Sequence, residues 1–376
     1  MKILLIFGTR PEAIKMAPLV RALRGRPGIT LRVCVTGQHR SMLDQALDIF
    51  DIRPDYDLAV MRPRQHLTRA TARILLGLER ILRHDRPDWL LVQGDTTTAM
   101  AASLAAVHAR VRLGHVEAGL RTGDAAHPWP EESNRRAIDS IADALWPPTE
   151  QAKANLLREN LSDRHIRVTG NTGVDALLQM RSALRARPDL LDACRRQCPY
   201  ADGARRLMLV TVHRRETLGP ALDAICTALA RLSRRGDVDI VFPVHPSPRV
   251  RQTVTRRLAG LSHVHVVDPL PYTAFLYVMD LAHVIVTDSG GIQEEAPVLG
   301  RPVLVLRHAT ERPEAVQLGT ARLVGTDACS IERAVTELLD DPEQHARMSR
   351  AHSPYGDGRA SERIAAHLCE LAGLLD

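Results

Sequence analysis

Short apolar runs alternate with longer amphipathic stretches along most of the chain, which is typical of parallel sheets whose strands are joined by crossover helices. The runs are continuously apolar, which indicates that helices cover both faces of each sheet. In the first half the predicted strands are residues 3–7, 31–35, 89–93 and 112–116. A second series is predicted at 207–212, 239–244, 264–267, 284–287, 303–306 and 322–324. The pattern predicts an α/β protein.

Two series of strands in 376 residues predict two domains. The composition changes near residue 170, where a short apolar run at 166–171 is followed by a helix predicted over about 174–186 and then by a polar stretch. We therefore expect a first domain over residues 1–170 and a second over 171–355. A last helix, predicted over 359–374, could pack on either one.

The charge balance favours small anionic ligands over nucleic acid. The chain has 50 Lys and Arg against 44 Asp and Glu, a formal charge of +6, and its only lysines are Lys2, Lys15 and Lys153. Yet 3 Trp, 5 Tyr and 4 Phe are too few for the stacking platforms of single-strand binders, and neither zinc-finger spacing nor a basic tail is present.

The cysteines and apolar runs indicate a cytoplasmic protein with free thiols. Six cysteines are scattered, and the one close pair, Cys194 and Cys198, is interpreted as helix surface because no partner pair completes a metal site. The run at 3–7 is too short for a signal peptide, and no later run reaches the roughly 18 apolar residues of a membrane span.

Polar segments follow the predicted strands, where ligands bind in open parallel sheets. These segments are 8–12, 94–98, 117–122, 213–216, 245–246 and 288–291. We expect their acidic and basic groups to face one cleft between the domains.

Residues 288–295 are interpreted as a strand end, a tight turn and a helix. Gly290 and Gly291 would let the backbone approach a phosphate at the helix N-terminus, and Glu295, one turn further on, could accept the hydroxyls of a ribose. Alternatively, Asp288 or Ser289 only caps the helix and Glu295 is a solvated acid.

Two histidines follow strands of the second series. His213 precedes two arginines, so it could donate a hydrogen bond to a pyrophosphate oxygen or transfer a proton, or it could be an ordinary loop residue. His245 precedes a proline, and such turns often need polar residues for structural reasons.

Residues 128–135 are predicted to form a rigid loop entering a helix. Glu131 and Arg135 could form a surface ion pair across one turn. Alternatively, Asp95, Glu117 and Glu131 converge, and carboxylates that share a site raise one another's pKa, as proton transfer requires.

Several motifs together resemble those of the non-hydrolysing UDP-N-acetylglucosamine 2-epimerases of bacteria. They are GTRPEAIK at 8–15, GDT at 94–96, HVEAGLRT at 115–122, PEESNR at 130–135, HRRE at 213–216, DSGGIQEEAP at 288–297, TERPE at 310–314 and YGDGR at 355–359. They span essentially the whole chain in the family's order. Thr217, Ala309 and Ser353 depart from the family pattern without removing a proposed catalytic group.

The resemblance implies two Rossmann-like, doubly wound domains facing a cleft, the GT-B type, with a C-terminal helix (356–376) that returns to the N-terminal domain, and a homodimer. It implies reversible conversion of UDP-N-acetylglucosamine to UDP-N-acetylmannosamine for surface polysaccharide, without a redox cofactor or a metal. UDP would leave by anti elimination, giving 2-acetamidoglucal, and would then add back to the other face.

The same resemblance implies roles for individual residues. Residues implied at the diphosphate are Arg10, Lys15, His213, Ser289, Gly290 and Gly291, with His245 as a further substrate-binding candidate. Glu295 would bind the ribose, and Arg312 the nucleotide or sugar. Asp95, Glu117 and Glu131 would be the acid–base groups near carbon 2, with His213 also in the catalytic set and Arg135 orienting the sugar. The base among the three carboxylates stays open.

Three alternatives share part of this pattern. A hydrolysing epimerase would release N-acetylmannosamine and UDP, whereas a GT-B glycosyltransferase would need an acceptor but no set of three carboxylates. A catalytically silent sugar-nucleotide sensor would need no acid–base groups at all.

Overall fold

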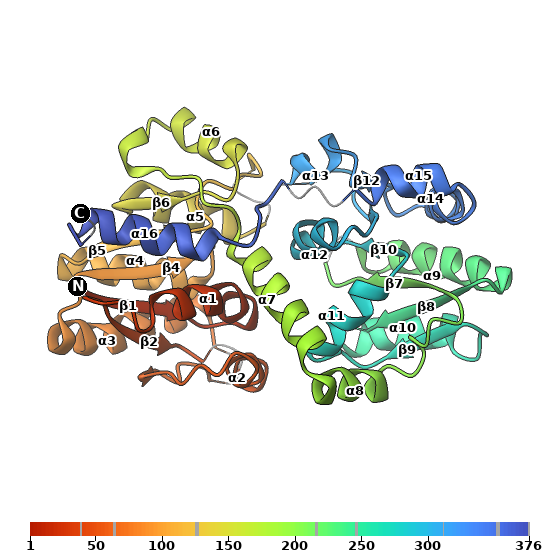
Figure 1. The fold of residues 1–376 in the computed structure, drawn as a ribbon, viewed down its shortest axis with the longest axis horizontal. Helices are drawn as coiled ribbons and strands as arrows, with labels where there is room; N and C mark the ends of the chain where they lie inside the picture. Colours follow the sequence, from red (N-terminus) through yellow and green to blue (C-terminus); the bar gives the residue numbers. More distant parts are fainter. Residues whose placement is uncertain are drawn as a thin grey trace. The chain divides into compact units, whose positions relative to one another are not determined.

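The computed structural model describes residues 1–37, 40–62, 65–124, 128–214, 217–244, 247–310, 312–350 and 354–374 (Figure 1). The chain forms two compact units. Unit 1 contains Met1–Ala176 and Tyr355–Asp376, and unit 2 contains Leu177–Pro354. The chain leaves unit 1 within helix α7 (Thr172–Ala186), a few residues beyond the composition change near residue 170.

Unit 1 contains a six-stranded parallel sheet in the order β3-β2-β1-β4-β5-β6. Its strands are β1 (Lys2–Phe7), β2 (Thr30–Val35), β3 (Tyr56–Asp57), β4 (Trp89–Gln93), β5 (Arg112–Val116) and β6 (Ala144–Trp146). Its helices, apart from the first turn of α7, are α1 (Arg10–Leu23), α2 (Arg40–Ile49), α3 (Leu67–Asp85), α4 (Thr97–Ala109), α5 (Glu131–Ile141), α6 (Glu150–Arg158) and α16 (Ala360–Leu371).

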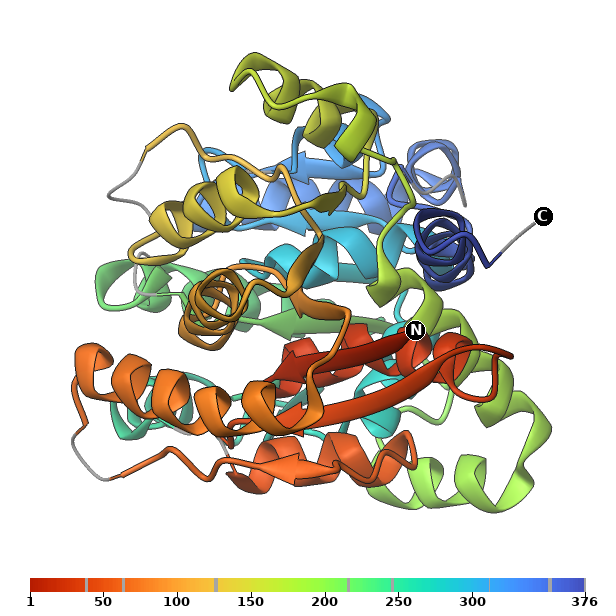
Figure 2. The same cartoon turned by 90° about the vertical axis from the view of Figure 1, so that its left-hand side faces the viewer.

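Helices cover both faces of this sheet, as its continuously apolar strands require. Figure 2 shows α3, α4 and α5 on one side of the strands and α16 on the other. Leu4, Ile6 and Val92 of the sheet pack with Leu78 and Ala102 of the helices in one buried cluster.

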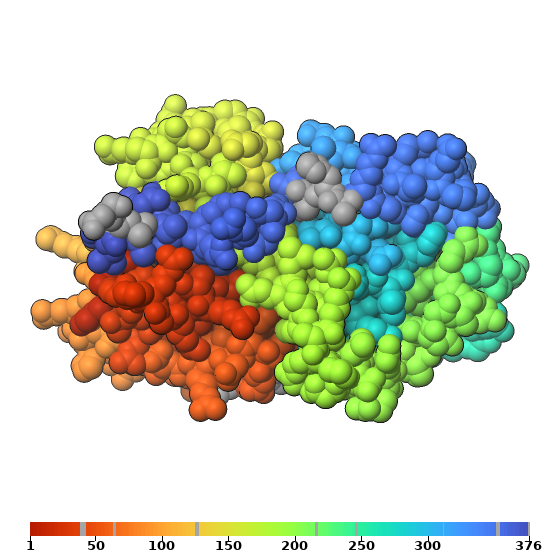
Figure 3. All heavy atoms as spheres, in the orientation of Figure 1, coloured from red at the N-terminus to blue at the C-terminus, as the bar shows by residue number. Residues whose placement is uncertain are grey.

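The C-terminal helix α16 belongs to unit 1 although it follows unit 2 in the sequence. It packs against α1, and Figure 3 shows it in blue on the surface of unit 1 beside the red N-terminal segment. The buried carboxylate of Asp175 accepts hydrogen bonds from the backbone N–H groups of Ala360 (3.1 Å) and Ser361 (2.7 Å). This acid therefore satisfies the first N–H groups of α16.

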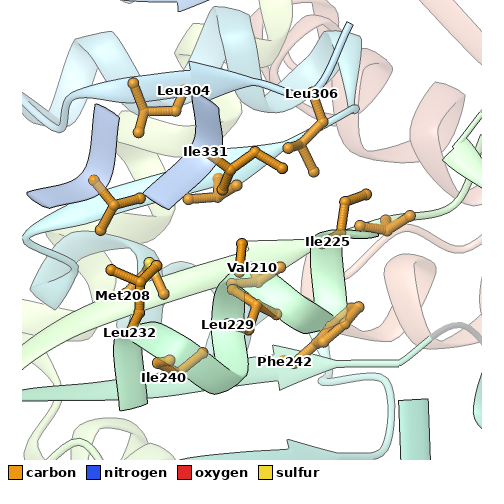
Figure 4. Close-up of a cluster of buried hydrophobic side chains, with 14 of the residues drawn as sticks. Met208, Val210, Ile225, Leu229, Leu232, Ile240, Phe242, Leu304, Leu306 and Ile331 are labelled. Atoms are coloured by element: carbon orange, nitrogen blue, oxygen red, sulfur yellow. The ribbon is translucent and has the colours of Figure 1, made fainter. Parts of the chain in front are cut away.

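Unit 2 contains a second six-stranded parallel sheet, in the order β12-β11-β10-β7-β8-β9. Its strands are β7 (Arg206–Thr211), β8 (Val238–Pro243), β9 (Val264–Val267), β10 (Val284–Thr287), β11 (Val303–Val305) and β12 (Ala321–Leu323). Its helices after α7 are α8 (Pro188–Gln197), α9 (Pro220–Leu232), α10 (Pro248–Leu258), α11 (Tyr272–Leu281), α12 (Gly290–Glu295), α13 (Pro313–Gln317), α14 (Ala328–Asp340) and α15 (Pro342–Met348). Figure 4 shows part of its core, where Val210 and Phe242 of the sheet pack with Ile225 and Leu229 of α9.

The two sheets have the same winding. In each, the first strand lies beside the fourth, β1 beside β4 and β7 beside β10, and the chain winds outward in both directions from that pair. This is the strand order of a dinucleotide-binding fold, and the point of reversal is where such sheets bind ligands. The prediction of two Rossmann-like, doubly wound domains is confirmed.

Two details differ from the expectations. Strands β3 and β6 were not predicted, because two or three residues give no recognisable period. The interpretation of Cys194 and Cys198 as helix surface is wrong, since both are buried and α8 packs against α11. Burial raises the pKa of both thiols, which makes them poor nucleophiles.

Candidate functional site

The turn after β1 is fixed by a capping box. Thr9 caps α1, and Glu12 Oε2 accepts hydrogen bonds from the backbone N–H groups of Gly8 (3.0 Å) and Thr9 (2.8 Å). A Cβ atom on Gly8 would lie 2.1 Å from Thr36 Oγ1, so only glycine fits. The site candidate Arg10 is the first residue of α1 and is held in place by this turn.

Glu12 also joins the turn after β1 to the turn after β4. Its second carboxylate oxygen, Oε1, accepts a hydrogen bond of 2.6 Å from Thr96, which caps α4. Burial raises the pKa of Glu12, although the hydrogen bonds from Thr96, Thr9 and Gly8 act in the opposite direction. The buried carboxylate of Glu12 thus forms hydrogen bonds to both loops at the point where the winding of the unit 1 sheet reverses.

Asp95 lies at the end of β4 and forms an ion pair with Arg135 of α5. Arg135, whose side chain is only 9% exposed, is also 3.3 Å from Glu132. Asn134 fixes the Asp95 turn by donating a 2.8 Å hydrogen bond to the Asp95 carbonyl. The alternative of a surface ion pair between Glu131 and Arg135 is wrong, because Arg135 points inward to Asp95.

Glu117 lies at the end of β5, the strand paired with β4, and forms an ion pair with Lys15. Asn171 donates a hydrogen bond of 3.2 Å to the same carboxylate oxygen. The backbone of Glu117 has φ +66°, a left-handed conformation that costs a residue with a side chain about 1–3 kcal/mol and is found mostly at functional sites. Its carboxylate lies over Gly94, where a Cβ atom would be 3.9 Å from Oε1.

Glu131 is the first residue of α5, the helix whose first turn contacts the Asp95 loop. Among the described residues its buried Oε2 atom has no hydrogen-bond partner. Asp95 and Glu117 thus lie at the ends of neighbouring strands, and each pairs with a cationic side chain from a helix. Glu131 begins helix α5, whose first turn contacts the Asp95 loop.

In unit 2, Asp288 at the end of β10 holds the loop after β7. Its buried carboxylate accepts hydrogen bonds from the backbone N–H groups of His213 (3.0 Å) and Arg214 (2.9 Å) and from the Thr217 hydroxyl. His213 Nδ1 lies 2.9 Å from Asp288 Oδ1, and the ring is 46% exposed. Burial opposes the charge of Asp288, but His213, Thr217 and Arg214 lower its pKa below the usual value.

Helix α12 begins directly after this turn. Ser289 is its N-cap residue but makes no side-chain capping bond, so the interpretation of Asp288 or Ser289 as a simple cap is wrong. The Arg312 guanidinium lies against Gly290, where a Cβ atom would be 2.5 Å from Nη1, and Arg312 Nε donates a 2.6 Å hydrogen bond to buried Glu294. Gly291, by contrast, has open space beside it, because a Cβ atom there would be 4.0 Å from the nearest side-chain atom.

The predicted site residues fall on both units. Unit 1 contains Arg10, Lys15, Asp95, Glu117, Glu131 and Arg135, and unit 2 contains His213, Ser289, Gly290, Gly291, Glu295 and Arg312. His245 lies outside the described residues. Glu295 is the last residue of α12 and is partly buried.

Sequence reasoning missed three residues that hold the site. Asp288 holds the loop after β7, and Glu12 joins the turns after β1 and β4. Asn171 donates a hydrogen bond to Glu117. The S/T-x-x-E spacing of Thr9 and Glu12 could have revealed the capping box. Asp288 could have been found only from the strand order, which places β10 beside β7.

The described residues contain neither a metal cluster nor a membrane-spanning helix. No group of three or more His, Cys, Asp or Glu side chains there is arranged to hold a metal ion. Each helix in the same ranges is too short or too polar to cross a lipid bilayer.

Known proteins resemble this chain over nearly its whole length. The family model described as UDP-N-acetylglucosamine 2-epimerase matches residues 21–369. The UDP-N-acetylglucosamine 2-epimerase of Escherichia coli is 53% identical over 365 residues, 97% of each chain. A probable UDP-N-acetylglucosamine 2-epimerase of Ralstonia nicotianae is 53% identical over 364 residues, 96% of this chain and 97% of the relative.

Solved structures agree. The crystal structure of the UDP-GlcNAc 2-epimerase from Neisseria meningitidis bound to UDP-GlcNAc superposes with a TM-score of 0.94 at 43% identity, over 98% of this chain and 100% of the other. The resemblance inferred from the motifs is thereby confirmed, and the chain belongs to the UDP-N-acetylglucosamine 2-epimerase family.

Proposed function

We propose that this protein interconverts UDP-N-acetylglucosamine and UDP-N-acetylmannosamine without net hydrolysis. The observation that carries the proposal is the arrangement of Asp95 and Glu117, which lie at the ends of adjacent strands and each pair with a cation. A protein that only binds a sugar nucleotide needs no such pair. The names of the relatives, which are 2-epimerases, support the same reaction.

The chemistry places two demands on the protein. The proton on carbon 2 is weakly acidic, so its removal must accompany departure of UDP from carbon 1. In the forward step the C2–H and C1–O bonds break and the C1=C2 double bond of 2-acetamidoglucal forms. In the second step UDP adds back to carbon 1 while carbon 2 receives a proton on its other face. The protein must therefore stabilise the diphosphate and supply an acid and a base.

The residues of unit 2 suit the first demand. His213, oriented by Asp288, and Arg312 would donate to the departing diphosphate, with the backbone at Ser289, Gly290 and Gly291 beside it. Glu295 would accept the ribose hydroxyls.

The residues of unit 1 suit the second demand. Asp95, Glu117 and Glu131 would move the proton at carbon 2, and Arg135 would orient the sugar. Lys15 would serve both steps, because its ammonium group pairs with Glu117 and adds positive charge for UDP, as would Arg10.

We also propose the setting in which the enzyme works. Six cysteines without a disulfide suit the reducing cytoplasm. The product would supply N-acetylmannosamine units for a surface polysaccharide, and the enzyme would act as a homodimer without a nucleic-acid or membrane partner, as the family resemblance implies.

The test is NMR of UDP-N-acetylglucosamine incubated with the protein in heavy water. We expect deuterium at carbon 2 in both UDP-sugars. Free N-acetylmannosamine and UDP would instead indicate the hydrolysing reaction, and the absence of both exchange and free sugar would overturn the proposal. The variant Asp268→Asn is a control, because the Asp268 side chain is 73% exposed and pairs only with Arg251 at the surface among the described residues.

A further inference from the structure

His115 is a fully buried histidine in the middle of the acid-bearing region of unit 1. It belongs to β5, two residues before Glu117, and its side chain is 0% exposed. Its Nδ1 atom lies 2.6 Å from Asp139 Oδ1, and its Nε2 atom lies 2.8 Å from the carbonyl oxygen of Gly94. The residue after Gly94 is Asp95, so this ring, which belongs to the strand before Glu117, contacts the backbone next to Asp95.

The two partners of the ring determine its protonation. A backbone carbonyl can only accept a hydrogen bond, so Nε2 must carry a proton and donate it to Gly94. A carboxylate also only accepts, so Nδ1 must carry a proton and donate it to Asp139. A neutral imidazole has one N–H group and cannot satisfy both acceptors, whereas the imidazolium ion donates at both nitrogens.

The contacts of Asp139 keep it in the acceptor form. Its other oxygen, Oδ2, accepts a 3.1 Å hydrogen bond from the Gly119 backbone N–H and lies 2.8 Å from Arg121 Nη1. Burial opposes the charge of Asp139, but His115 and Arg121 lower its pKa below the usual value. Arg121 also pairs with Glu159 at 2.6 Å. The negative charge of Asp139 is therefore balanced by Arg121, and part of the positive charge of Arg121 is balanced by Glu159.

We propose that His115 is held as a buried imidazolium ion and acts, with Asp139, as a positioning residue for the acid–base groups. The positioning role rests on the proposed function. His115 fixes the carbonyl of Gly94, directly before Asp95, and Asp139 fixes the N–H of Gly119, two residues after Glu117. Both hydrogen bonds fall on glycines with left-handed backbone, φ +66° at Gly94 and +81° at Gly119, a conformation that a residue without Cβ adopts readily. One buried ion pair therefore sets the separation of the two acidic side chains.

The protonation is tested by NMR of the protein with ¹⁵N-labelled histidine. Of the 16 histidine rings, that of His115 should show two protonated nitrogens at pH 7, a signal identified by its disappearance in His115→Gln. A neutral His115 ring at pH 7 would overturn the proposal. This measurement needs no substrate, so it stands even if the proposed reaction fails.

The positioning role is tested by kinetics of two variants. In His115→Gln the single amide nitrogen of the new side chain cannot donate to both Asp139 and Gly94. In Asp139→Asn an amide N–H group replaces one of the two carboxylate oxygens that accept hydrogen bonds. Each should lower kcat about 100-fold, the scale of an ångström-sized misplacement, with less than a threefold change in KM. His84→Gln is the matched control and should retain wild-type kcat.

Two outcomes would overturn the positioning role. Either variant with wild-type kcat would do so, as would a rise in KM at unchanged kcat, since that pattern indicates lost substrate binding. If His115→Gln does not fold, Asp139→Asn and the ring NMR of the wild-type protein still decide. Absence of activity in the wild-type protein would be a failure of the proposed function instead.

Discussion

Unit 1 and unit 2 share one strand order but present different chemistry where their winding reverses. In unit 1 the strand ends carry carboxylates that are paired with cations, Asp95 with Arg135 and Glu117 with Lys15. In unit 2 the carboxylate at that point, Asp288, is turned inward to orient His213. The fold therefore supplies the same position twice, and the residues placed there decide whether it presents carboxylates paired with cations or a histidine oriented by a buried carboxylate.

The histidines away from the substrate-binding candidates show the same contrast. His115 of unit 1 faces a carboxylate and a carbonyl, which favour the imidazolium ion. His283 of unit 2 instead stacks on His345 with 3.8 Å between ring centroids. Burial lowers the pKa of His283 to about 4, and the positive charges of His345, Arg206 and Arg301 act in the same direction. Partners, rather than burial alone, set the charge.

The largest effect should come from neutralising the acids of unit 1. Asp95→Asn and Glu117→Gln should each lower turnover at least about 100-fold, the usual scale for an acid or base, while UDP binding measured by calorimetry stays within a few fold. Glu343→Gln is the control, because that side chain is 89% exposed. Near-normal turnover in either acid variant would remove that residue from the acid–base set. It would also weaken the proposed difference in chemical role between the strand ends of the two units.

Replacing one glycine by alanine in each unit should change the free energy of unfolding by different amounts. In Gly8→Ala the new Cβ atom would meet Thr36 Oγ1 at 2.1 Å and Thr98 Oγ1 at 2.4 Å, so we expect a loss of about 1–3 kcal/mol in the free energy of unfolding, measured in urea. Gly291→Ala in unit 2 has no contact closer than 4.0 Å and should not lose stability. Equal stability of both variants would contradict this expectation and show that the loop after β1 can move to accommodate the extra Cβ atom.

Lys15→Arg should have a smaller effect on activity. Arginine keeps the charge but replaces a compact ammonium by a planar fork, and the Lys15 side chain has only 14% exposure beside Glu117. We expect turnover to fall about tenfold, equivalent to about 1.4 kcal/mol, in a coupled assay. Lys153→Arg is the control, since Lys153 pairs with Asp163 at the surface. Undiminished turnover would make this lysine an accident of composition.

The smallest effect should be a pH dependence of stability in unit 2. The folded protein keeps His283 neutral down to about pH 4, whereas an unfolded histidine takes up its proton near pH 6.5. The unfolded state therefore binds more protons between these values, and stability falls as the pH is lowered from 6.5 to 4. Partial exposure reduces the effect to about 1 kcal/mol. His283→Gln should remove this part of the acid limb in thermal unfolding curves, and an unchanged limb would contradict the assignment.

Much of the fold could be predicted from the sequence because both sheets are covered on both faces. Among the described residues, continuously apolar runs located ten of the twelve strands to within one or two residues, and β3 and β6 were missed because they are so short. The prolines and acids at 128–132 located the start of α5 at Glu131. Strand order was not predictable from these signals, because periodicity reports burial and not neighbours.

The candidate site was predictable in its residues but not in its pairings. Motifs identified Lys15, Asp95 and Glu117 as candidates, but they did not show that Glu117 pairs with Lys15 or that Asp95 pairs with Arg135. Lys15 and Glu117 are 102 positions apart, and His213 and Asp288 are 75 apart. No local pattern links residues at such distances.

The sequence by itself determined which elements form, where helices begin and which side chains follow each strand, because these depend on residues a few positions apart. Only the tertiary structure decided that Asp288 orients a histidine and that His115 contacts Asp139. The physical reason is that hydrogen-bond partners and burial fix the charge of a side chain, and both arise only when strands distant in sequence become neighbours.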